Sequence, residues 1–421
     1  MKSIIKVNLI LLLLSSIFIP LNAQDYAIPH RFVDNYYFRS RDIQVDKNII
    51  YGQAENYKGQ TEILDLDLYY PSAAVDSLKK KPLIMLVHGG SKGDNSRTEK
   101  YCPLFAQRGF VVCNINRRKG RKNNKESEIL KEAYRAVQDA HAALRYLISN
   151  AQKYGIDTTA IFVGGVSAGA LTAMGISYMN QTDFDNHYPE ITRELGRIDN
   201  STNDLNTKFS VRGVINMWGQ IADTSFISHE EAHHIPVIIF HSTADSSQSP
   251  YEKALQLVNR FKNLGGCYQL HTSSGTGHTE GISKYYIAEQ TGCFLKCVLC
   301  NSCISLVTEV NKEDFSCFDA LTIDNSKYHR SYIKPDPLIM IQYEGIYKSE
   351  GGKIKIVLEN EHLFIVDEQN GFKAEMHPES EDDFYLRDDN IQFTFIRNEN
   401  GQVNGLTFFI DAKEISAKRI R

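Results

Sequence analysis

The stretch IFVGGVSAGALTAM, residues 161–174, decides how the whole sequence is interpreted. An apolar run precedes a G-x-S-x-G motif centred on Ser167, and a run of small residues follows it. In this motif the serine lies on a sharp turn from strand to helix, which lifts its hydroxyl above a sheet. Glycines flank the serine because a Cβ there would collide with the neighbouring strand and helix. The stretch therefore predicts a strand, a nucleophilic serine and a helix, in that order.

The segments on either side repeat this alternation of strand and helix. Residues 127–155 and 251–266 have apolar side chains at helical spacing and end in glycine. Near-continuous apolar runs are typical of strands that are buried on both faces; they occur in PLIMLVHGG (82–90), FVVCNIN (110–116), VRGVINMW (211–218), PVIIFHS (236–242) and CYQLHTSS (267–274). The fold class predicted is α/β, a doubly wound, mostly parallel sheet with helices on both faces.

The chain of 421 residues is long enough for more than one domain. From about residue 339 the pattern changes to short alternating runs broken by Gly, Asn and Asp, which indicates a small antiparallel β domain. The predicted organisation is a signal peptide, an α/β catalytic domain, a linker that contains cysteine, and an all-β domain, at residues 1–23, 24–299, 300–338 and 339–421.

The N-terminus has the composition of an export signal. Lys2 and Lys6 precede an apolar run over residues 7–19, and LNA follows before Gln24. This order is typical of a secretory signal peptide cleaved after Ala23. The alternative is a membrane anchor, but the run is shorter than the roughly 20 residues that a span needs. We expect a secreted or periplasmic protein with no membrane span after cleavage.

The bulk composition excludes little. The apolar fraction of 42% and the charged fraction of 23% are those of a soluble globular protein, and the net charge of -4 gives no reason to expect a nucleic-acid partner. Four of the eight cysteines crowd into CFLKCVLCNSC, at Cys293, Cys297, Cys300 and Cys303. In an exported protein the spacing favours disulfides or packed thiols, and a metal site is the alternative.

A serine nucleophile needs a base, and the base needs a carboxylate that orients it. In the predicted fold these two groups follow the serine along the chain, each just after a strand. Asp245 follows the strand at 236–242, and His278 follows the strand at 267–274. The order Ser167, Asp245, His278 therefore predicts a catalytic triad.

A glycine-rich loop predicts the oxyanion site. Residues 88–91, HGGS, follow an early buried strand, and small residues there let backbone N–H groups point into a site. We expect Gly89, Gly90, Ser91 and Ala168 to form the oxyanion hole, where losing one donor typically costs about 3 to 4 kcal/mol of transition-state stabilisation.

Three further segments each allow two interpretations. HEEAHH, residues 229–234, spells the H-E-x-x-H motif of zinc proteases, but Pro236 and a strand follow at once, so a polar loop near the substrate is favoured. The basic run at 117–125 is typical of solvated surface, although it begins where α/β sheets bind ligands. The polar stretch at about 180–210 is either an insertion that overhangs a pocket or a plain surface loop.

Residues 53–296 resemble α/β-hydrolases of the esterase and lipase type, near the bacterial carboxylesterases and the acetyl-xylan and feruloyl esterases. The matching segments are LDLYYP, HGGSKG, FAQRGFVVCNINRR, AVQDAHAALRYLISNAQKYGID, GGVSAGA, HSTAD and GTGH. The resemblance implies Ser167 as nucleophile, Asp245 as acid and His278 as base. Two departures are Ser242, where the family usually has glycine, and Pro250, which lies one residue late. The C-terminal segment resembles the lipocalin-like domains of some secreted hydrolases.

These observations lead to an expected function. The chain is expected to be a secreted serine hydrolase that cleaves carboxylic esters through an acyl-enzyme, with small-molecule or carbohydrate-linked esters as substrates and no cofactor or metal. The resemblance favours acetyl or feruloyl esters of plant polysaccharides. The alternatives are a peptidase-like hydrolase of amides and a binding protein whose hydrolase domain is vestigial.

Overall fold

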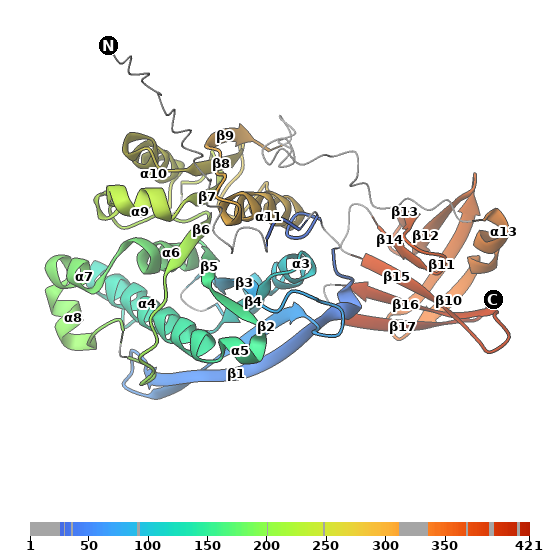
Figure 1. Ribbon diagram of the computed structural model, residues 1–421, viewed down its shortest axis with the longest axis horizontal. Helices are drawn as coiled ribbons and strands as arrows, with labels where there is room; N and C mark the ends of the chain where they lie inside the picture. The colour runs from blue at the N-terminus through green and yellow to red at the C-terminus, as the bar shows by residue number, and fades with distance from the viewer. Residues whose placement is uncertain are drawn as a thin grey trace, which may run out of the picture.

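The computed structural model describes residues 26–28, 30–34, 37–90, 93–199, 201–246, 249–310, 336–367, 369–386, 391–410 and 413–421. They form a sheet domain covered by helices and a separate β-barrel (Figure 1). Within these residues, no helix combines the length and the apolar composition that crossing a bilayer requires. The predicted signal peptide, residues 1–23, lies outside the described residues.

The sheet has nine strands in the order β1-β2-β4-β3-β5-β6-β7-β8-β9. From β4 to β9 all neighbours are parallel, whereas β2 pairs antiparallel with both β1 and β4. The mostly parallel α/β sheet predicted from the sequence is thus confirmed. The strands span Ile43–Glu55, Thr61–Pro71, Lys81–Val87, Val111–Ile115, Ile156–Val166, Val211–Met217, Val237–Ser242, Tyr268–Ser273 and Leu306–Glu309.

Helices cover both faces of this sheet. The long helix α4 (Glu126–Ser149) packs with α6 (Ala168–Tyr178) and α10 (Tyr251–Leu264) on one face, and α3 (Cys102–Gln107) and α11 (Lys284–Leu299) cover the other (Figure 1). Two apolar cores result, one on each face. The shorter helices of this domain are α2 (Ser96–Glu99), α5 (Ala151–Tyr154), α7 (Gln181–His187), α8 (Pro189–Leu195) and α9 (His229–His234).

The C-terminal domain is a closed barrel of eight antiparallel strands, each paired with its neighbour in sequence and the last with the first. This up-and-down arrangement removes every free edge, and aromatic side chains such as Phe384 and Phe395 fill its core. The predicted antiparallel β domain is confirmed. Its strands β10 to β17 span Gly345–Ser349, Gly352–Glu359, His362–Asp367, Phe372–Pro378, Asp383–Tyr385, Ile391–Arg397, Val403–Ile410 and Lys413–Arg419, preceded by α13 (Pro337–Met340).

Polar contacts join the barrel to the sheet domain just before β1. The carboxylate of Asp383, at the start of β14, pairs with Arg39 at 2.5 Å and with Arg41 at 3.2 Å. Between these arginines, the backbone N–H of Ser40 donates to the side chain of Gln392. The segment before β1 therefore contacts β14 and β15 of the barrel across the domain junction.

Two parts of the sequence are more ordered than expected. Strand β9 pairs in parallel with β8, inside the segment 300–338 that we interpreted as linker. The cysteines also pair differently from a compact cluster: Cys303 bonds to Cys267, Cys293 is disulfide-bonded, and Cys297 and Cys300 are free thiols. Both expected forms, disulfide and packed thiol, are thus present.

Candidate active site

Ser167 lies at the turn between β5 and α6, as the motif predicts. Its backbone has φ 55° and ψ -118°, a conformation that side chains other than glycine rarely adopt. The flanking glycines make this turn possible, because a Cβ at Gly169 would overlap the carbonyl oxygen of Val87, and a Cβ at Gly165 would lie 2.6 Å from that same oxygen. Close approach of α6 to β3 and β5 therefore dictates the G-x-S-x-G pattern.

The three residues of the predicted triad meet at the carboxyl ends of the strands. His278 Nε2 lies 2.8 Å from Ser167 Oγ, and His278 Nδ1 lies 2.6 Å from Asp245 Oδ2. The Asp245 side chain is fully buried, whereas 28% of the His278 side chain is exposed. The histidine is thus fixed by a buried carboxylate on one side and touches the serine hydroxyl on the other.

The loops that carry Asp245 and His278 are tied together by a serine that the sequence interpretation treated as a departure. Ser242 Oγ accepts a hydrogen bond from Trp218 Nε1 at 2.7 Å and donates to the Glu280 carbonyl at 2.8 Å. Glu280 lies two residues after His278, so this buried hydroxyl holds the loop of the histidine. Glycine at this position would leave the indole N–H of Trp218 without its acceptor.

Three of the ten described non-glycine residues with positive φ angles lie at this edge of the sheet. Besides Ser167, the non-glycine residues Trp218 and Thr279 have positive φ angles of 53° and 61°. Trp218 directly follows β6, and Thr279 directly follows His278. Strained backbone persists only where the surrounding structure over-determines it, and it clusters at functional sites.

The predicted oxyanion loop lies beside the serine. A Cβ at Gly89 would lie 3.3 Å from the Ser167 Cβ, and Gly90, with φ 76°, lines the same cavity as Ser167. Ala168 is the first residue of α6, where a helix leaves its N–H without an intrahelical acceptor. Ser91 lies outside the described residues. Gly90 and Ala168 therefore line the same cavity as Ser167.

The imidazole ring of His88, the first residue of this loop, is uncharged and contacts the loop backbone. Burial lowers the pKa of His88 to about 3, and its Nδ1 lies 3.1 Å from the Gly89 carbonyl oxygen. Because a carbonyl only accepts, Nδ1 carries the proton and donates. This hydrogen bond holds the Gly89 carbonyl and so restrains the backbone of the loop.

A cavity of about 370 Å³ opens over Ser167 and His278. Its charged lining comes from Arg117 and Arg121, which belong to the basic run after β4, and from Glu132 of α4. Arg117 is only 2% exposed. The solvated-surface interpretation of residues 117–125 is thus wrong at the start of the run, because the carboxyl end of β4 delivers these residues to the site.

An apolar pocket adjoins the cavity and shares Ala133, Leu171 and Thr172 with it. Its lining also includes Phe184 of α7, Ile191 of α8, and Tyr188 between these two helices. Residues 180–210 were interpreted either as an insertion that overhangs a pocket or as a plain surface loop. The lining of this pocket supports the first interpretation. Sequence patterning did not reveal it, because each of these short helices buries a single apolar side chain in its own segment.

The H-E-x-x-H segment forms the short helix α9, in which His229 and His233 face each other with Nε2 atoms 3.1 Å apart. Both rings are exposed, and neither lines the cavity over Ser167. The prediction of a polar loop near the substrate is thus wrong, because the segment is helical and lies away from that cavity. Across the described part of the chain, no group of three or more His, Cys, Asp or Glu side chains is arranged to hold a metal ion. Nothing there supplies the third ligand that zinc-protease chemistry requires.

Comparison with solved structures finds esterases. Butyrate-bound esterase 2 from the Planctomycetes species Thermogutta terrifontis is 20% identical, with a TM-score of 0.43, over 60% of this chain and 91% of that chain. A truncated carbohydrate esterase from gut microbiota is 19% identical, with a TM-score of 0.43, over 63% of this chain and 98% of that chain. At these values neither likeness bears on the substrate of this chain. No curated protein matches the sequence.

Comparison with protein families is more informative. Residues 66–233, from β2 to α9 and including Ser167, match the BD-FAE family, whose members are bifunctional acetyl-xylan and feruloyl esterases with the α/β-hydrolase fold. Residues 329–419, which include the barrel, match a domain of unknown function, DUF3471. The chain therefore combines an α/β-hydrolase domain that matches the BD-FAE esterase family over residues 66–233 with a C-terminal barrel that matches DUF3471.

Proposed function

We propose that this esterase works through the triad Ser167, His278 and Asp245 and an acyl-enzyme on Ser167. The observation that carries the proposal is the His278 ring, which bridges the serine hydroxyl at 2.8 Å and the buried carboxylate at 2.6 Å. Such an arrangement turns a weakly nucleophilic hydroxyl into an attacking group.

In the first half-reaction Ser167 Oγ attacks the ester carbonyl while His278 Nε2 takes the hydroxyl proton. Asp245 holds the ring in the tautomer with the proton on Nδ1 and stabilises the imidazolium. The N–H groups of Gly90 and Ala168 stabilise the oxyanion of the tetrahedral intermediate. His278 then gives its proton to the departing alcohol, and a water activated by the same ring releases the acid.

The substrates proposed are acetyl or feruloyl esters of plant polysaccharides, as the family description suggests. The apolar pocket beside Leu171 and Thr172 suits the acyl group, because both residues border the serine cavity and lead away from the charged side chains. We further propose that the protein acts outside the cytoplasm. The disulfide between Cys267 and Cys303 supports this, since disulfides persist in oxidising compartments.

Steady-state kinetics on an ester and an amide test the reaction class. We expect turnover of 4-nitrophenyl acetate and methyl ferulate and none of 4-nitroacetanilide. Asp245→Asn should lower kcat by about 10⁴-fold, because an amide at this position favours the wrong histidine tautomer. Ser167→Ala should abolish turnover, whereas Ser177→Ala, on the helix α6 that follows Ser167, should retain it. Ester hydrolysis that survives Ser167→Ala would contradict the mechanism.

A further inference from the structure

Arg117 is a buried guanidinium at the edge of the catalytic cavity. One of its terminal nitrogens donates to the Gly90 carbonyl at 2.8 Å, the other lies 3.5 Å from the Arg118 carbonyl, and its Nε has no hydrogen-bond partner. No carboxylate of the described residues lies within ion-pair distance of it. An arginine keeps its charge at any physiological pH. A buried charge without a counter-ion is costly, and proteins rarely retain one without use.

The neighbouring charges do not neutralise it. Glu132 Oε2 pairs with Arg121 at 2.7 Å, and its other oxygen is buried without a hydrogen-bond partner. Arg117, Arg121 and Glu132 are the only fully charged side chains among the described residues that line the cavity, so one positive charge is in excess beside Ser167 and His278.

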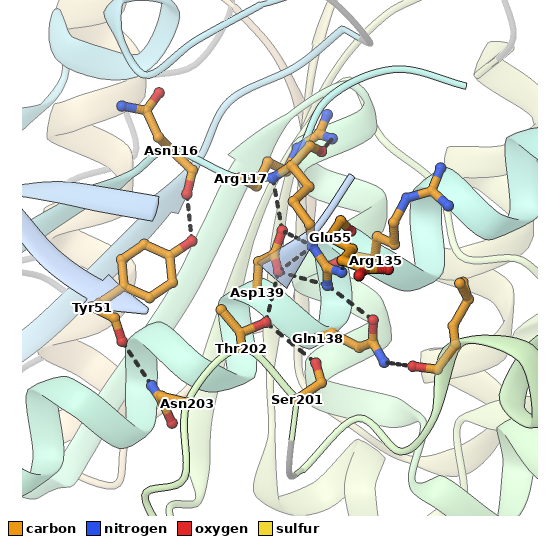
Figure 2. A network of polar contacts seen from close by, with 12 residues as sticks. Tyr51, Glu55, Asn116, Arg117, Arg135, Gln138, Asp139, Ser201, Thr202 and Asn203 are labelled. Carbon is orange, nitrogen blue, oxygen red and sulfur yellow. Dashed lines mark hydrogen bonds and ion pairs between the residues drawn. The ribbon is translucent and has the colours of Figure 1, made fainter. Parts of the chain in front are cut away.

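Arg117 is also held in place rather than free to swing into solvent. The preceding residue, Asn116, accepts a hydrogen bond from Tyr51 at its carbonyl, and the following residue, Arg118, pairs with Asp139 of α4 at 2.8 Å. Figure 2 shows these contacts as one network, in which Thr202 also donates to Asp139 and Gln138 contacts Arg118. A chain anchored on both sides of Arg117 presents a preorganised cation, the condition under which a charged ligand binds well.

We propose that Arg117, assisted by Arg121, binds a carboxylate on the alcohol part of the substrate, so that this esterase favours acylated saccharides that carry a uronic acid. The inference rests on the proposed function. The alcohol part is assigned to the arginines because the apolar pocket beside Leu171 takes the acyl group. The planar guanidinium matches a carboxylate with paired hydrogen bonds.

The overall field of the protein does not produce this preference. The net charge is -4, so long-range electrostatics disfavour an anionic ligand. A measured preference for the carboxylate would therefore come from Arg117 and Arg121 at the site and not from the net charge of the protein.

Binding of a product analogue tests the site independently of catalysis. The probes are 4-hydroxybenzoate and its neutral amide, 4-hydroxybenzamide, titrated against the full-length protein by ligand-observed NMR. We expect the acid to bind about 10- to 100-fold more tightly, the range for one hydrogen-bonded charge. Arg117→Gln should reduce this ratio to about one. Equal binding of acid and amide, or binding of neither, would overturn the inference.

Arg117→Gln also loses the contact to Gly90, and this variant could fail to fold for that reason alone. Variants that keep the contact therefore test the carboxylate site independently. Glu132→Gln removes the competing negative charge and should raise the ratio, whereas Arg121→Gln should lower it. The matched control is Arg197→Gln, which removes the same charge from a side chain that is 55% exposed and should leave the ratio unchanged. A control that shifts the ratio as far as Arg121→Gln does would overturn the local assignment.

Kinetics separate this inference from the proposed function. The kcat/KM for 4-acetoxybenzoate should exceed that for 4-acetoxybenzamide in the wild type and not in Arg117→Gln. A preference found instead for the adipic acid monoester of 4-nitrophenol over 4-nitrophenyl hexanoate would overturn the assignment to the alcohol part. Tight binding of 4-hydroxybenzoate with no ester turnover would support the carboxylate site and contradict the proposed function.

Discussion

Ser242 is the residue whose role differs most from its appearance in the sequence. Its hydroxyl joins Trp218 to the Glu280 carbonyl, and so ties the end of β6 to the loop of His278. The residue that departs from the family pattern is thus part of the frame of the site.

We predict that Ser242→Ala lowers both stability and rate. The buried indole N–H loses its acceptor, which costs about 1–3 kcal/mol, and the His278 loop loses a tie, so kcat should fall more than KM changes. Thermal unfolding and ester kinetics measure the two effects. Ser177→Ala, which loses one hydrogen bond to the Ala173 carbonyl, is the matched control. A Ser242→Ala variant equal to this control in kcat would contradict the positioning role.

At the residue scale the sequence predicts the groups that follow strands and misses those that act across loops. Ser167, Asp245 and His278 could be predicted to lie together because the carboxyl ends of parallel strands meet at one edge of a sheet. The two hydrogen bonds of Ser242 join residues 24 and 38 positions apart, and no local pattern marks them. Arg117 looked like a solvated surface residue in the sequence, because its burial depends on packing against α4 and the Gly90 loop, which no local pattern shows.

At the scale of elements, buried histidines make the sheet domain sensitive to acid. Burial lowers the pKa of both His88, after β3, and His271, within β8, to about 3, against about 6.5 in an unfolded chain. Between these values the unfolded state binds more protons, so stability falls as the pH drops from about 6.5 towards 3.

We predict that His271→Gln flattens this dependence. Each such histidine contributes about 1.4 kcal/mol per pH unit to the slope of the unfolding free energy, so removing one should reduce the slope between pH 4 and 6 by that amount. Urea unfolding at several pH values measures it. The exposed His362→Gln is the control. An unchanged slope in His271→Gln would show that this ring is not held neutral.

The disulfide between Cys267 and Cys303 secures the last element of the sheet. It closes a loop of 36 residues that contains β8 and α11. The double variant Cys267→Ser/Cys303→Ser should lose about 4 kcal/mol of unfolding free energy, because the unfolded chain gains loop entropy. Denaturant unfolding measures the loss, with Cys300→Ser, a free thiol, as control. A double variant as stable as the control would contradict this role.

Elements with strong periodicity were predictable, and short ones were not. The runs around β3 to β8 are continuous apolar strands between clear helices, whereas β9 has four residues and is recognisable only through its pairing with β8. The pairing of Cys267 with Cys303 depends on that same arrangement, so the cysteine spacing alone could not specify it.

At the scale of the whole molecule, Asp383 fastens the barrel to the sheet domain through Arg39 and Arg41. Burial alone would raise the pKa of Asp383, but hydrogen bonds from Thr394 and Ser380 and the two arginines lower it below its ordinary value. A carboxylate with a lowered pKa stabilises the fold at neutral pH, and this contribution is lost as the pH falls through the folded-state pKa.

We predict that Asp383→Asn loosens the domain junction without stopping ester hydrolysis. The arginines lose their counter-ion, so the radius of gyration from X-ray scattering should rise, and proteases should cut between the domains faster. Glu375→Gln changes the same charge on the barrel, at a residue paired with His362, and should not have this effect. Scattering curves that coincide for Asp383→Asn and Glu375→Gln would contradict it. The sequence could not place the barrel, since this contact joins residues 344 positions apart.

Covalent labelling shows whether Ser167 is the nucleophile of this esterase. The purified protein is treated with a fluorophosphonate, and mass spectrometry locates the modified residue while hydrolysis of 4-nitrophenyl acetate is followed in the same sample. We predict one label, on Ser167, with turnover lost in proportion to labelling and no label in Ser167→Ala. A folded protein that hydrolyses the ester while the label lies elsewhere, or that takes up no label, would contradict it.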